Sequence, residues 1–136
     1  MASAIVMADV KAYLAAGWSR VPVEHPNETS VAPADGSAFL AVQYPIAGEE
    51  QMSIGAPGAN VFREEGVIRL VMMIPRGAGV EPWNTWLDEA RTLFRAKQFG
   101  VVRTYEASPA VLDDRNDDGK YWALSSAITY DADFLG

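Results

Sequence analysis

Apolar residues near the start of the chain recur at the spacing of an amphipathic helix. Four of them fall on one helical face: Val6, Val10, Tyr13 and Leu14. We predict this helix over residues 3–16, with Ser3 in the N-cap position and Gly17 where the helix stops. The alternation that follows predicts a short strand at 20–24, and the Pro-, Asn- and Gly-rich residues 25–36 predict a loop.

Two β segments follow this loop. Residues 37–46 are apolar without helical spacing, and we expect that strand to end at Pro45 or shortly after. Residues 61–75 contain a nearly continuous apolar run, which is typical of a strand covered on both faces. The small residues between them predict a long loop at 47–60, with a short strand at 51–54 inside it.

The clearest helical stripe comes after residue 80. Its apolar members recur every three or four positions: Trp83, Trp86, Leu87, Ala90, Leu93 and Phe94. We predict a helix over 82–97, with acidic residues towards its start and basic residues towards its end, as the helix dipole favours. Alternating residues then predict strands at 101–107, 110–112 and 121–130, with a polar turn at 113–119.

This order of elements predicts an α+β fold. The expected architecture is a mostly antiparallel sheet packed by one N-terminal helix and one crossover helix. A length of 136 residues corresponds to a single domain spanning 1–136.

Composition narrows the classes of function. The chain has no cysteine, which excludes disulfides, thiolate metal sites and thiol nucleophiles, and its one histidine cannot build a multi-histidine site. A net charge of −7 argues against binding to a nucleic-acid backbone. No apolar stretch is long enough to span a membrane, and the N-terminus does not resemble a secretory signal, so we expect folding in a cytoplasm.

One motif carries metal-ligating chemistry. The oxygens of Asp114, Asn116 and Asp118, followed by Gly119, match the first half of a calcium loop. The twelfth position is Ser125 where that loop needs a bidentate carboxylate, so we interpret the segment as a solvated hairpin turn. We therefore expect no metal, cofactor or catalytic residue and no enzyme, with a metal-assisted hydrolase using 113–118 as the alternative.

The remaining candidate groups have simpler interpretations. His25 lies in a loop sequence without a nucleophile elbow around any nearby serine or threonine. Glu49-Glu50 and Glu64-Glu65 are neighbours on strands and point to opposite faces, so we read them as solvated surface rather than an acid/base pair. Four tryptophans exceed what a chain of this size readily hides, so we expect part of this surface to contact another chain.

Several of these segments together resemble a known family. They are the strand Ala-Phe-Leu-Ala-Val-Gln at 38–43, the strand at 66–75, Gly77-Ala78-Gly79 leading into the next helix, and the closing segment 128–134. Over residues 3–134 the chain is similar to the small tail-terminator, or tail-completion, proteins of long-tailed bacteriophages.

The resemblance implies a structural role in the virion, in the neck region of the tail, after assembly in the host cytoplasm. Such proteins form a ring, usually of six copies, on the last ring of the tail tube, where they halt polymerisation and join the tail to the head-side connector or stopper protein. DNA would pass through the lumen without specific binding, and no membrane is involved. A phage-derived particle such as a gene transfer agent, and another neck component such as a head-completion or stopper protein, remain alternatives.

The interface residues expected from this role are both acidic and apolar. They are Glu49, Glu50, Met52, Ile54, Glu64, Glu65, Trp83, Trp86 and Trp122. We expect the four glutamates, with the acidic loop 113–118, to contribute charge to the lumen or to a face of the ring.

Overall fold

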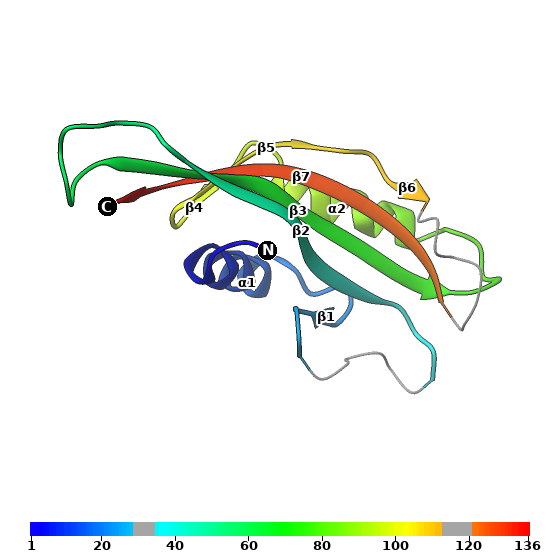
Figure 1. The fold of residues 1–136 in the computed structure, drawn as a ribbon. Helices are drawn as coiled ribbons and strands as arrows, with labels where there is room; N and C mark the ends of the chain where they lie inside the picture. Colours follow the sequence, from blue (N-terminus) through cyan, green and yellow to red (C-terminus); the bar gives the residue numbers. More distant parts are fainter. Residues whose placement is uncertain (29–34, 113–120) are drawn as a thin grey trace.

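The computed structural model describes residues 1–28, 35–112 and 121–136 (Figure 1). Its elements are α1 (Ala4–Gly17), β1 (Val23–Glu24), β2 (Phe39–Gln51), β3 (Val61–Pro75), α2 (Trp83–Phe94), β4 (Gln98–Phe99), β5 (Val102–Ala107), β6 (Val111–Leu112) and β7 (Tyr121–Leu135). The predicted α+β class is confirmed, and the predicted bounds of β3 are those observed.

The strands form one sheet in the order β1-β2-β3-β7-β5-β4, with β6 also paired to β7. Every pairing is antiparallel except that of β1 with β2. Strands β3 and β7 pair along their whole lengths, from Val61 opposite Leu135 to Pro75 opposite Tyr121. These two long central strands therefore set the long axis of the molecule.

A single hydrophobic core covers one face of the sheet. Alternate residues of β3 from Ile68 to Ile74 are fully buried, together with Val6, Val10 and Leu14 of α1 and Leu87, Ala90 and Phe94 of α2. On the opposite face of β3, Val71 is buried whereas Val67 and Met73 are half-buried. The expectation of a strand covered on both faces thus holds only for its middle.

The two helices also contact each other through Tyr13. Its ring stacks on Phe99 with a centroid separation of 4.0 Å and meets Phe94 edge-on. Its hydroxyl donates a hydrogen bond of 2.6 Å to the carbonyl oxygen of Leu93. Ser3 occupies the predicted N-cap position of α1. Its hydroxyl makes no capping hydrogen bond, so the predicted side-chain cap is wrong.

The predicted end of β2 is wrong. The strand continues through Pro45 to Gln51, with an irregularity between Gln43 and Ile46. Beyond Leu40 and Ala41, which pair with β1, one edge of β2 has no strand partner in the described residues, so a proline that donates no hydrogen bond is tolerated there. The loop predicted at 47–60 is therefore wrong for residues 47–51, and the connection to β3 is confined to 52–60. The separate short strand predicted at 51–54 is also wrong, because Gln51 ends β2 and 52–54 are not a strand.

Strands β2, β3 and β7 continue past both helices to the 52–60 connection and the C-terminus (Figure 1). We call this projection, residues 46–66 with 131–136, the arm. Its base contacts the start of α1, where the Ser3 amide donates a hydrogen bond to Glu64.

Candidate functional site

The tip of the arm is built by hydrogen bonds between the hairpin end and the C-terminus. The backbone groups of Asn60 and Gly136 bond each other in both directions at 2.9 Å. The Ser53 hydroxyl accepts a hydrogen bond of 2.8 Å from the Val61 amide, and the Asn60 side chain accepts one of 3.2 Å from the Ala56 amide. The tip is thus a defined structure rather than a loose connection.

Apolar side chains remain exposed at this tip. Ile54 is 88% exposed, and Met52 and Leu135 are exposed as well. Isolated exposed apolar residues are ordinary, but three at the end of one projection form a candidate contact surface. This agrees with the expectation that Met52 and Ile54 face a partner, which stays a prediction.

The acidic residues of the arm separate by strand alternation. Glu49 lies opposite Glu64 and Glu50 opposite Arg63 in the register of β2 and β3. Glu49, Glu50 and Glu65 are exposed, and the described residues include no ion-pair partner for them. A shallow groove of about 450 Å³ runs beside them between the two strands.

Glu64 does not belong to this exposed group. Its side chain is buried, and one carboxylate oxygen accepts hydrogen bonds from the Tyr130 hydroxyl at 2.6 Å and from the Ser3 amide at 3.2 Å. Burial, together with this bond to Glu64, raises the pKa of Tyr130 above its usual value. The expectation that Glu64 contributes surface charge is therefore wrong, because the start of α1 and β7 cover it.

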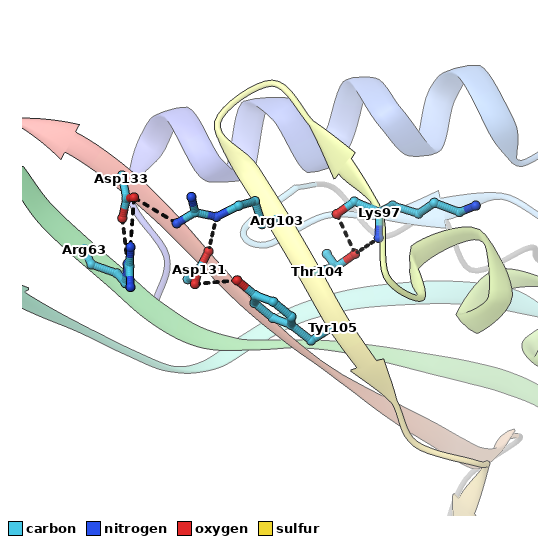
Figure 2. A network of polar contacts seen from close by, with 7 residues as sticks. All are labelled: Arg63, Lys97, Arg103, Thr104, Tyr105, Asp131 and Asp133. Carbon is cyan, nitrogen blue, oxygen red and sulfur yellow. Dashed lines mark hydrogen bonds and ion pairs between the residues drawn. The ribbon is translucent and has the colours of Figure 1, made fainter.

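An ionic network that sequence reasoning missed lies on the other face at the same level of the sheet (Figure 2). Arg63 binds Asp133 through two hydrogen bonds of 2.8 and 3.1 Å. Arg103 contacts Asp131 at 2.5 Å and Asp133 at 2.9 Å, and the Tyr105 hydroxyl donates to Asp131 at 2.7 Å. Hydrogen bonding to Arg63, and also to Arg103, lowers the pKa of Asp133 to about 2.

A sequence signal for this network existed. Asp131 and Asp133 lie two residues apart in β7, as Arg103 and Tyr105 do in β5, so each pair shares one face of its strand. The pairing of β5 with β7, which brings them together, could not be read from the spacing alone.

The tryptophans expected at interfaces pack mainly within the fold. Trp83, Trp86 and Trp122 are half-buried against the core, and the Arg20 guanidinium lies 5.7 Å from the centre of the Trp86 ring. Their contact with another chain stays a prediction. The most exposed large apolar side chain in the described residues is Ile54 of the arm.

The described residues contain no group of three or more His, Asp or Glu side chains placed to hold a metal ion. The acidic segment 113–118, with the partial calcium motif, lies outside the described residues. Neither helix of residues 1–28, 35–112 and 121–136 has the length and apolar character needed to cross a membrane.

The family model of phage tail terminator proteins matches residues 4–130. The chain belongs to this family. The resemblance noted in the sequence is thereby confirmed, and the chain is a structural protein of the bacteriophage tail. One solved structure is 18% identical to this chain. The match spans 98% of this chain and 94% of the solved one, with a TM-score of 0.58. That likeness concerns the fold alone, and no curated protein matches the chain.

Proposed function

We propose that the terminator forms a closed ring of six copies on the last ring of the tail tube, ends tube polymerisation and joins the tail to the head-side connector. The observation that carries this proposal is the arm, a projection stiffened by three strands that presents apolar and acidic side chains at its end. An exposed surface of this kind is typical of a site that binds other protein chains.

The mechanism is physical. A growing tube exposes unpaired subunit surface at its end. A ring that complements this surface on one side and presents a different surface on the other prevents the next tube ring from binding. Contacts between unlike surfaces of neighbouring copies form a closed ring when the rotations that relate each copy to the next add up to a full turn.

Charge fits the same proposal. The chain carries −7 overall, and Glu49, Glu50 and Glu65 are exposed on the arm. Acidic side chains facing a lumen or a ring face let DNA pass without binding, because its phosphates are repelled. The particle is a virion or a phage-derived device such as a gene transfer agent.

Tube length in the presence of the terminator tests the function. Purified tail tube protein is polymerised alone and with increasing terminator, and lengths are measured by electron microscopy. We expect shorter tubes that carry an extra ring at one end. A chain with Met52→Ser and Ile54→Ser tests the tip of the arm. Both side chains are exposed, so the fold should be kept, and this variant is expected to shorten tubes less than the wild type. Tubes of unchanged length with bare ends would contradict the proposal, and binding to the head-side connector alone would favour another neck component.

A further inference from the structure

We propose that the arm of one terminator docks into the groove between α1 and α2 of a second copy, with the Ile54 tip as the apolar anchor. This inference rests on the proposed ring and names the contact that would close it. Two surfaces of the same chain complement each other in charge: an apolar tip near exposed glutamates and an apolar groove lined by Lys97.

The receiving surface is a groove of about 510 Å³ between the C-terminal ends of the two helices. Its apolar lining includes Tyr13, Trp18 and Leu93. Tyr13 is fixed by its stacking on Phe99, and the Trp18 ring nitrogen donates a hydrogen bond of 3.2 Å to the Val21 carbonyl. Rigid aromatic walls of this kind accept an aliphatic side chain with little loss of side-chain entropy.

Lys97 is an exposed cation that lines this groove. Among the other charged lining residues, Arg20 and Glu89 pair with each other, whereas Lys97 does not pair within the described residues. Arg95 directly follows α2. The side chains of Arg95 and Lys97 are both exposed, and within the described residues neither has an ion pair or side-chain hydrogen bond. The other lysines and arginines of the described chain each have such a contact.

The position of Lys97 is set by its backbone. Its amide donates a hydrogen bond of 3.0 Å to the Thr104 hydroxyl, and its carbonyl accepts one of 2.8 Å from the Thr104 amide. Figure 2 shows the side chain extending away from the carboxylates of Asp131 and Asp133. The ammonium group is therefore presented outward from a fixed backbone.

The arm carries the opposite charges. Glu49, Glu50 and Glu65 are exposed without an ion pair in the described residues, and they stand close in sequence and register to the apolar tip. An apolar tip with nearby acids thus matches an apolar groove that presents the ammonium group of Lys97. Complementary rim charges of this kind fix orientation and speed association more than they add affinity.

The direction of the contact also follows from the fold. The β3–β7 ladder extends the arm beyond both helices, so its tip lies away from the core of its own chain (Figure 1). Because the arm and the groove are different surfaces of one chain, each copy receives one arm and donates another. That arrangement is heterologous, as ring formation requires.

Charge reversal on each surface tests the contact in the full-length chain. One variant carries Glu49→Lys with Glu50→Lys, and the other carries Arg95→Glu with Lys97→Glu. Each is expected to raise the concentration of half-assembly at least tenfold, measured by light scattering coupled to gel filtration. An equimolar mixture of the two is expected to restore assembly, because reversed arms then meet reversed grooves.

Two controls separate this contact from general charge effects. Glu24→Lys with Glu106→Lys makes the same change in net charge away from the arm and is expected to leave assembly unchanged. Thermal unfolding of each variant verifies that it is folded. If the arm-reversal variant assembles as the wild type does, or if the mixture of the two folded variants stays unassembled, the docking contact is overturned and the proposed ring is not. A wild-type chain that stays monomeric at every concentration overturns both.

Discussion

The buried bond between Tyr130 and Glu64 gives a sharp prediction about how the arm is attached to the core. The Tyr130 hydroxyl donates a hydrogen bond of 2.6 Å to the Glu64 carboxylate, whose other donor within the described residues is the Ser3 amide. Tyr130→Phe removes that donor without changing the ring that packs in the core. Glu64 is then left buried with one fewer hydrogen bond.

The size of the loss follows from the charge of the acceptor. A hydrogen bond to a charged group contributes about 1.5–3 kcal/mol to the free energy of unfolding. Unfolding entropy of about 2.1 cal/mol/K per residue gives about 0.29 kcal/mol/K for 136 residues. Tyr130→Phe is therefore expected to lower the melting temperature by about 5–10 °C.

The assay combines urea unfolding with amide hydrogen exchange. Stability is expected to fall, and exchange is expected to quicken most at residues 62–66, next to the lost bond. Glu64→Gln is the matched variant: it keeps an acceptor for Tyr130 and removes the buried charge, so its cost is expected to be smaller. A loss below about 0.5 kcal/mol for Tyr130→Phe would show that this hydrogen bond does not stabilise the fold, because losing the donor to a buried carboxylate should cost more than that.

Three further changes probe the arm. Asp133 has a folded pKa of about 2, below its ordinary value of 3.8, so it stabilises the fold above pH 4 and loses that effect as the pH falls towards 2. The stability gap between wild type and Asp133→Asn in urea unfolding is accordingly expected to close over that range. Gly66→Ala would press a methyl group against the Ile46 carbonyl and the Tyr130 ring, which should cost about 1–3 kcal/mol in thermal unfolding. Ile54→Ser, at an 88% exposed position, is expected to change that free energy by less than about 0.5 kcal/mol.

The central elements could be predicted because their residues repeat at the period of one structure. Strand β3 reads as a continuous apolar run, and its observed bounds match the prediction. Helix α2 has a single apolar stripe, and the residues of that stripe are those buried or half-buried in the core. In both elements the local pattern and the tertiary contacts favour the same structure. The helix predicted to end at residue 97 stops at Phe94, so its predicted end is wrong.

The arm could not be predicted as well, because its strands carry the signals of turns. Pro45 and Gly48 indicate an end to β2, yet pairing with β3 continues to Gln51. Asp131 and Asp133 are poor strand formers, and the prediction for β7 stopped at Tyr130. Their contacts with Arg103 and Arg63 come from other strands, so the stabilising partner is invisible in a local window.

Prediction from the sequence also fails for a single residue of the candidate site, Glu64. Strand alternation places Glu64 and Glu65 on opposite faces, which is correct, but it does not say which face is covered. Glu64 is buried because Tyr130 lies diagonally across the ladder and α1 begins above it. A surface role for Glu64 therefore fails on a contact between residues 66 positions apart.

Two polar clusters stabilise the arm where it leaves the core. Glu64 and Tyr130 bond on the helix-covered face, and Arg103 binds Asp131 on the opposite face. Hydrogen bonds to carboxylates thus add to the hydrophobic burial that fixes the rest of the sheet. An arm held in this way before it meets a neighbour loses little conformational entropy on docking, which is the condition under which a small apolar tip contributes useful affinity.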